Sequence, residues 1–139
     1  MRQAQKEISV ATTGPGLYEV TRDVAAFLAP LGIETGLLTA FCRHTSASLV
    51  IQENADPDVQ RDLVAFFARL VPNGDPLFVH TMEGPDDMPA HVKSALTQTS
   101  LSIPIANGAL VLGTWQGLYL FEHRRAPHKR KIVLHVVGM

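Results

Sequence analysis

The chain has 139 residues, 46% of them hydrophobic and 18% charged, which is enough for one domain with its own apolar core. Its formal net charge of −1 argues against nucleic acid as the main partner, because binding to a phosphate backbone needs a surplus of cations. No apolar run approaches the length of a membrane span, and the first residues lack the apolar core of a secretory signal. The single cysteine, Cys42, lies in an apolar run and cannot form an internal disulfide. We therefore expect a cytoplasmic protein in which Cys42 is a small core residue rather than a nucleophile.

The chain begins with a strand pattern followed by a helix pattern. Residues 5–12 alternate in polarity and predict a strand, and the glycines and proline of residues 13–16 predict a turn. Apolar residues then recur every three or four positions. This spacing predicts an amphipathic helix over 17–29, which Pro30 and Gly32 end.

Two strands and a second helix are expected next. The strands fall at 35–43 and 46–51, and the link between them is too short for a crossover, so we expect a hairpin or one bent strand. The helix has a strong N-cap in Asp56 and a proline, Pro57, at its first position, and the turn residues of 72–76 end it. Its apolar residues form one stripe: Val59, Leu63, Phe66, Phe67 and Leu70.

The rest of the chain combines a polar loop, a short helix through about residue 97, and three β-like segments. These segments lie at 109–114, 117–124 and 129–137. The fold class predicted for the single domain, residues 1–139, is therefore α+β, with a mostly antiparallel core of about six strands and two to three helices.

Residues 80–91, with the sequence HTMEGPDDMPAH, bring two histidines and three carboxylates together within twelve positions. Gly84 and Pro85 predict a turn, and Pro89 suits the first turn of a helix. Acidic side chains just before a helix lie where its dipole favours negative charge. Two interpretations follow: Asp87 and its neighbours only cap a short helix, or the loop binds a metal ion or an anion.

Three of the six histidines lie at element ends or in loops, where functional residues tend to collect: His44, His80 and His91. No pair has the i, i+4 spacing of a zincin helix, and no cysteine accompanies them, so spacing alone indicates a metal only weakly. His135 alternates with apolar neighbours in the last strand and is expected to be structural or at the surface. His128 lies in the basic segment 124–131, which is expected to be a solvated surface, with phosphate binding as the alternative.

Other polar residues also have two interpretations. Trp115, which has a glycine two residues away on each side, either fills a gap in the core or lines a pocket. Glu53 and Asp56 belong either to a site or only to the turn and cap of a helix. Ser46 and Ser48 are disfavoured as nucleophiles, because no Gly-x-Ser-x-Gly turn surrounds them.

Five motifs occur in order along the chain: HTSASL at 44–49, ENADP at 53–57, EGPDDMPAH at 83–91, IPI at 103–105 and GTWQG at 113–117. In this order and spacing the chain resembles, from its first strand to its last, the family called YjbQ-like or UPF0047, also named the secondary thiamine-phosphate synthase family. The resemblance implies a compact α+β fold with a β-sandwich-like core, assembled as a homotrimer. It also implies a polar site at or near the subunit interface, with a bound metal ion.

The resemblance assigns residues to this site. The matching positions are His44, Thr45, Ser46, Glu53, Asp56, His80, Asp87, His91, Trp115, Gln116 and Glu122. We expect a divalent metal ion to be bound by His44, His80 and His91, because imidazoles suit Zn²⁺ and three protein ligands leave a position for water or substrate. A Mg²⁺ ion on the carboxylates of Glu83, Asp86 and Asp87 is the alternative. The residues expected to act in catalysis are Glu53, Asp56 and Asp87. Those expected to bind substrate are Thr45, Ser46, Lys93, Trp115, Gln116 and Arg124.

The family name suggests a reaction, in which an aminopyrimidine diphosphate and a thiazole phosphate give thiamine phosphate and pyrophosphate. A divalent cation would assist departure of the diphosphate, and Lys93 or Arg124 would neutralise phosphate oxygens. The chain lacks the glycine-rich phosphate loop and the barrel length of enzymes dedicated to this step, so we expect it as a side activity. The alternatives are a metal-dependent hydrolase of a small phosphorylated molecule and a non-catalytic trimer that binds a metal or metabolite. The segment after Arg124 matches the family least well, which leaves His128 without an assigned role.

Overall fold

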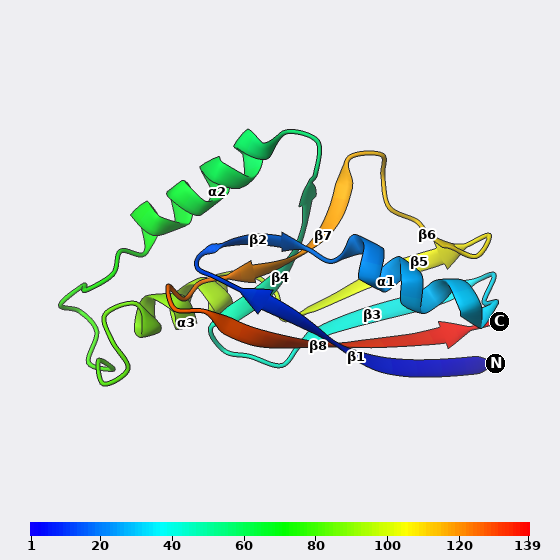
Figure 1. Ribbon diagram of the computed structural model, residues 1–139, viewed down its shortest axis with the longest axis horizontal. Helices are drawn as coiled ribbons and strands as arrows, with labels where there is room; N and C mark the ends of the chain where they lie inside the picture. Colours follow the sequence, from blue (N-terminus) through cyan, green and yellow to red (C-terminus); the bar gives the residue numbers. More distant parts are fainter.

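The computed structural model describes residues 1–139 as two antiparallel sheets with three α-helices (Figure 1). The strand bounds are β1 Arg2–Thr12, β2 Gly16–Glu19, β3 Gly36–Cys42, β4 Ala47–Glu53, β5 Ser100–Ala106, β6 Ala109–Leu110, β7 Gln116–Glu122 and β8 His128–Gly138. The helices are α1 Thr21–Leu28, α2 Pro57–Leu70 and α3 Asp87–Leu96, with a 3₁₀ turn at Ala29–Leu31. One sheet has the strand order β1-β8-β3-β5-β6 and the other β2-β7-β4. The predicted α+β class is confirmed, with eight strands rather than about six.

The two sheets and α1 share one apolar core. In β8, Ile132, Leu134 and Val136 are buried and the residues between them are half-exposed, as the two-residue period of a strand requires. The thiol of Cys42 is buried in the same core, as predicted. Strand β7 differs, because every residue from 117 to 122 is buried. This strand lies between the five-stranded sheet and α2, so both of its faces are covered (Figure 1).

The helix predicted over 17–29 is wrong in its first turn. Residues Gly16–Glu19 form β2, in which Leu17 pairs with Phe121 of β7. The apolar spacing is continuous across this segment, but the open edge of β7 offers its first residues a strand partner. The helix α1 starts at Thr21, and its residues Val24 and Phe27 are buried as the pattern predicted.

The hairpin considered for residues 35–51 is also wrong, because the two strands belong to different sheets. Strand β3 lies between β8 and β5, whereas β4 pairs with β7. The chain passes from one sheet to the other at His44–Ser46, which is closer to the alternative of one bent strand. This crossing places Thr45 near α3, where its carbonyl oxygen accepts a hydrogen bond from His91.

Strand β5 has no counterpart among the strands predicted from the sequence. Its residues Leu101, Ile103 and Ile105 are buried and the residues between them are exposed, so the two-residue period is present. Pro104 argues against a strand here, because proline has no N–H group to donate to a neighbouring strand. It is tolerated because β5 has only the two-residue β6 on its outer side.

Helix α2 begins at Pro57 and ends before residue 72, as predicted, but its apolar stripe is only partly buried. Asp56 Oδ1 accepts a hydrogen bond of 2.9 Å from the main-chain nitrogen of Asp58, which confirms the N-cap. However, no residue of α2 is fully buried, and Phe66 remains 48% exposed. Figure 1 shows the helix standing apart from most of the sheet, held in part by the edge-to-face contact of Phe67 with Phe121. None of the three helices is long and apolar enough to cross a membrane.

Candidate metal centre

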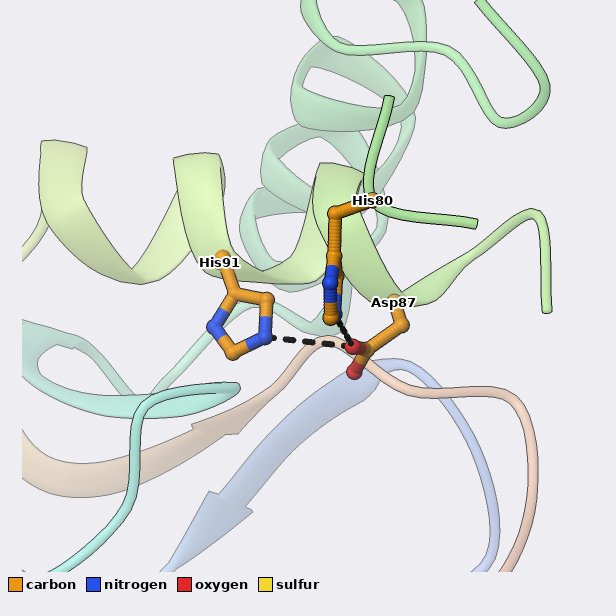
Figure 2. Close-up of side chains that lie close together, drawn as sticks. All are labelled: His80, Asp87 and His91. Atoms are coloured by element: carbon orange, nitrogen blue, oxygen red, sulfur yellow. Dashed lines mark hydrogen bonds and ion pairs between the residues drawn. The ribbon is translucent and has the colours of Figure 1, made fainter. Parts of the chain in front are cut away.

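Two histidines and one aspartate converge at the start of α3 (Figure 2). His80 Nε2 lies 2.8 Å from Asp87 Oδ2, and His91 Nε2 lies 3.1 Å from the same oxygen. Asp87 and His91 are four residues apart, so they project from one face of the helix. His80 reaches them from the preceding loop (Figure 2). One nitrogen of each ring and one carboxylate oxygen, all within 4.8 Å of one another, form a cluster of possible ligand atoms.

Each side chain on α3 in this cluster is oriented by a further partner. His91 Nδ1 donates a hydrogen bond of 2.9 Å to the carbonyl oxygen of Thr45, which directs Nε2 toward Asp87. Asp87 Oδ1 accepts a hydrogen bond of 2.7 Å from Arg124 Nη1, which leaves Oδ2 facing the two rings. Metal-binding histidines and carboxylates are commonly held by such secondary hydrogen bonds.

Arg124 joins both aspartates at the start of α3. Its Nε donates to Asp86 Oδ2 at 3.1 Å, and the main-chain nitrogen of Arg125 donates to the same oxygen at 2.9 Å. Burial alone would raise the pKa of Asp87, but the hydrogen bond from His80 and the charge of Arg124 outweigh it and lower the pKa. The pKa of Asp86 is likewise lowered, against its burial, by hydrogen bonds from Arg125 and Arg124. Both carboxylates are therefore ionised at neutral pH.

The interpretation that these acids only cap a helix is wrong. Asp86 occupies the N-cap position, but its side chain makes no capping hydrogen bond. Its carboxylate is turned to Arg124 and Arg125 instead, and that of Asp87 to Arg124 and the two histidines.

The donor set fits a zinc-type ion. Bonds of about 2.0–2.2 Å in tetrahedral geometry separate neighbouring ligand atoms by roughly 3.3 Å, close to the two separations around Asp87 Oδ2. Without a metal, both hydrogen bonds to this oxygen require a hydrogen on each Nε2, so His91 would carry hydrogens on both ring nitrogens. A metal ion replaces these hydrogens and removes that requirement. Two nitrogens and one oxygen suit Zn²⁺ better than Mg²⁺, which prefers oxygen ligands throughout.

The cluster opens to solvent between two hollows. The side chain of His80 is 46% exposed and that of His91 is 29% exposed. His80 lines a hollow of about 320 Å³ formed with the loop before α3, and His91 lines another of about 270 Å³. The first volume lies within the range of about 300–1,000 Å³ that small-molecule sites occupy, and the second lies just below that range.

His44, expected as a third histidine ligand, lies outside the cluster of ligand atoms. Its Nε2 accepts a hydrogen bond of 2.8 Å from the main-chain nitrogen of Lys131. Burial, followed by the charge of Arg130, lowers the pKa of His44, so its ring is uncharged at neutral pH. His44 and Thr45 line the same hollow as His91, so these three residues share one wall without sharing a ligand position.

Four other expected site residues lie around the start of α2 and the loop before β7, at the opposite end of α2 from the segment that leads to α3 (Figure 1). Glu53 Oε2 accepts a hydrogen bond from the main-chain nitrogen of Asp56, so both acids serve the turn and cap. Trp115 is 63% exposed, which excludes the first of its two interpretations, that it fills a gap in the core. Gln116 Oε1 accepts a hydrogen bond of 2.8 Å from the main-chain nitrogen of Gly113.

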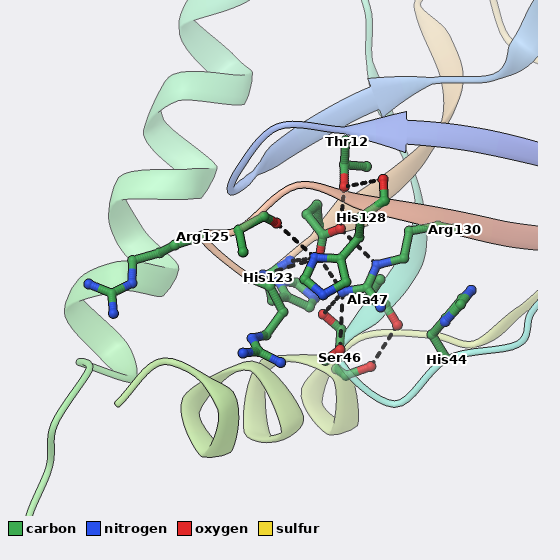
Figure 3. A network of polar contacts seen from close by, with 12 residues as sticks. Thr12, His44, Ser46, Ala47, His123, Arg125, His128 and Arg130 are labelled. Atoms are coloured by element: carbon green, nitrogen blue, oxygen red, sulfur yellow. Dashed lines mark hydrogen bonds and ion pairs between the residues drawn. The ribbon is translucent and has the colours of Figure 1, made fainter. Parts of the chain in front are cut away.

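A buried ion pair lies beside the cluster and was missed in the sequence, where Arg130 was expected on a solvated surface (Figure 3). Arg130 Nε donates to Glu122 Oε1 at 2.7 Å, and Thr12 donates to the same oxygen at 2.6 Å. Ser46 Oγ accepts a hydrogen bond of 3.1 Å from Arg130, so this serine is held in the network. The available signal was the alternation of β8, which places Arg130 on the same face as Ile132.

These features define a two-sheet α+β domain with a candidate metal centre at a helix start. The chain belongs to the UPF0047 YjbQ-like family, whose model matches residues 6–139. It is 55% identical to a UPF0047 protein of Synechocystis over 137 residues, covering 99% of this chain and 93% of that one. The UPF0047 protein YjbQ of Escherichia coli is 41% identical over 136 residues, covering 96% and 97%.

Solved structures agree with this assignment. A crystal structure of a yjbq/upf0047 family protein from Clostridium acetobutylicum superimposes with a TM-score of 0.87 at 34% identity, covering 95% of this chain and 99% of that one. A conserved protein from Thermus thermophilus gives a TM-score of 0.85 at 36% identity, with the same coverage of 95% and 99%.

Proposed function

We propose that the protein binds a divalent metal ion of the zinc type at His80, Asp87 and His91 and acts with it on a small phosphorylated molecule. The observation that carries the proposal is the convergence of two imidazole nitrogens on one oxygen of a buried carboxylate. Thr45 and Arg124 orient the two ligands on α3, as expected of a site built for a metal ion. The exposure of both rings leaves room for a water molecule or substrate.

A bound ion would supply a Lewis acid and an activated water molecule. Around it, the chain offers a base and a cation. The exposed carboxylate of Glu83 has its Oε2 3.6 Å from His80 Nε2, where it can accept a proton. Arg124 Nη2 donates to the carbonyl oxygen of Glu83 at 3.1 Å, so one guanidinium group connects this loop with Asp87.

Assembly as a homotrimer is part of the proposal. Leu37 and Phe41 lie on the middle strand of the five-stranded sheet, on the face away from the core, and are 40% and 48% exposed. Burial of this face against a second subunit would remove apolar surface from water. Phe41 also lines, with His44 and Thr45, a hollow of about 400 Å³, so such an interface would adjoin the wall that His91 shares.

The test compares chelator-treated protein with the same protein reloaded with Zn²⁺ or Mg²⁺. The substrates are a panel of small phosphorylated molecules, together with the aminopyrimidine diphosphate and thiazole phosphate pair that gives thiamine phosphate. We expect turnover only with metal, lost in His80→Ala and retained in Arg61→Ala, whose side chain is 79% exposed on α2 and pairs with Asp58. Metal-independent turnover would contradict the proposal. Metal binding without turnover would favour the alternative of a non-catalytic protein that binds a metal or metabolite.

A further inference from the structure

A second cavity, of about 200 Å³, lies between α2, α3 and β7 and includes none of the three cluster residues. Its apolar wall is formed by α2 and β7, including the rings of Phe67 and Phe121. Its polar wall includes Lys93, His123 and Arg125. In Figure 3 the side chain of Arg125 extends from the buried network toward α2. The cavity therefore combines an aromatic surface with two cationic side chains.

Lys93 is the unusual member of this wall. The residue is only 7% exposed, yet its ammonium group forms no hydrogen bond or ion pair within the chain. The ammonium nitrogen itself is not sealed from water, because the chain has no buried side-chain nitrogen that lacks a hydrogen bond. The aliphatic stem of Lys93 accounts for most of the buried surface, and the charged end faces the cavity. The nearby carboxylate of Asp86 is already bound by Arg124 and by the main chain of Arg125. Lys93 therefore presents an unpartnered cation to the cavity.

The carboxylate in the same wall does not offset this charge. Glu122 lines the cavity, but Oε1 accepts from Thr12 and Arg130, and Oε2 accepts from main-chain nitrogens and Arg130. Its charge is thus neutralised by Arg130 on the core side. Arg125, with a side chain 58% exposed, adds a second positive charge at the mouth of the cavity.

His123 contributes an uncharged hydrogen-bonding group. Its Nε2 is 2.9 Å from Ser48 Oγ, and Nδ1 has no hydrogen-bond partner in the chain. Burial lowers the pKa of His123 to about 3, so the ring adds no charge at neutral pH. His123, which carries this free nitrogen, lines the same polar wall of the cavity as Lys93.

We propose that this cavity binds a phosphate group attached to a small aromatic group. Lys93 and Arg125 bind the phosphate oxygens, and the aromatic group packs against Phe67 and Phe121. Two cations and a neutral imidazole match a doubly charged phosphate better than a singly charged carboxylate. The binding does not require a metal ion, so this inference stands independently of the proposed function.

The test is calorimetric titration of chelator-treated protein with phenyl phosphate, inorganic phosphate and benzoate. Phenyl phosphate binds most tightly if both walls contribute. Lys93→Gln weakens its binding about ten- to one-hundred-fold, the usual effect of losing a hydrogen bond to a charged group. The matched control is Lys129→Gln, which removes the same charge from an exposed position on β8 and leaves binding unchanged.

A second variant keeps the test decisive if Lys93→Gln fails to fold. Ala68 lines the cavity from α2 and is exposed, so a larger side chain there is tolerated. The variant Ala68→Phe fills the cavity without altering Lys93, and it also abolishes binding. The inference is overturned if folded Lys93→Gln or Ala68→Phe binds phenyl phosphate as well as the unaltered protein does. It is also overturned if Lys129→Gln weakens binding equally, or if benzoate binds as tightly as phenyl phosphate. Failure of the metal proposal would appear instead as absent Zn²⁺ binding, with these titrations unaffected.

Discussion

The guanidinium group of Arg124 holds Asp87 Oδ1 at 2.7 Å and thereby turns Oδ2 toward His80 and His91. Replacement of such an orienting partner commonly weakens metal binding about 10–100-fold. We expect Arg124→Gln to weaken Zn²⁺ binding by this amount, measured by competition with a chromogenic chelator. The control is Arg125→Gln, whose guanidinium group lies 3.9 Å from Asp86 and makes no contact with Asp87. Unchanged affinity in folded Arg124→Gln would show that Asp87 needs no such partner.

Acid should destabilise the protein through His123. Its pKa is about 3 in the folded chain and near 6.5 when unfolded, because burial disfavours the charged ring. Above pH 6.5 neither state is protonated, and the full stability is present. As the pH falls below 6.5, only the unfolded chain takes up the proton, and stability decreases by about 1.4 kcal/mol per pH unit.

The matched variant for this pH effect is His123→Gln, which can retain the hydrogen bond to Ser48. Between pH 6.5 and 5, the free energy of unfolding of the unaltered protein should fall by about 2 kcal/mol more than that of the variant. Urea titrations at several pH values provide the measurement. Parallel curves for the two proteins would mean that His123 is not buried as a neutral ring.

Two leucine substitutions distinguish the core from the stripe on α2. Leu134 is fully buried in β8, so Leu134→Ala should cost about 2–5 kcal/mol of unfolding free energy. Leu63 is only half-buried, and Leu63→Ala should cost about 1 kcal/mol. Urea unfolding of both variants tests this difference. An equal cost would indicate that α2 packs more closely, for example against another subunit.

The ion pair of Glu122 and Arg130 should be costly to break on one side only. Glu122→Gln leaves the charge of Arg130 buried without its counter-ion and should cost about 3–5 kcal/mol. The double replacement Glu122→Leu, Arg130→Met removes both charges and should cost less than the single one. Urea unfolding of the two variants makes the comparison, and a double variant that is less stable than the single one would contradict this reasoning.

Strong local patterns were readable from the sequence. The alternation of β8 and the Asp56 cap of α2 depend on neighbouring residues alone. The stripe on α2 shows that one face is apolar, but it does not show how closely a sheet approaches that face. Strand β5 was readable by period, yet Pro104 obscured it, because proline is rare in strands with two partners.

The site was predictable only in part. Residues four apart in a helix share a face, so Asp87 and His91 could be paired once α3 was recognised. The approach of His80 depends on the conformation of the loop before α3. The orientation of His91 depends on a main-chain carbonyl, that of Thr45, which any residue would provide. No side-chain pattern marks such a contact, and none indicated that His44 Nε2 binds the main chain at Lys131.

Zinc titration of chelator-treated protein tests the metal centre most directly. Isothermal calorimetry should give about one Zn²⁺ per chain for the unaltered protein and for His44→Ala, because His44 lies outside the cluster. The double variant His80→Ala, His91→Ala should remain folded, since both rings are partly exposed, and should bind no Zn²⁺. A folded double variant that still binds one Zn²⁺ with unchanged affinity would contradict the proposed centre.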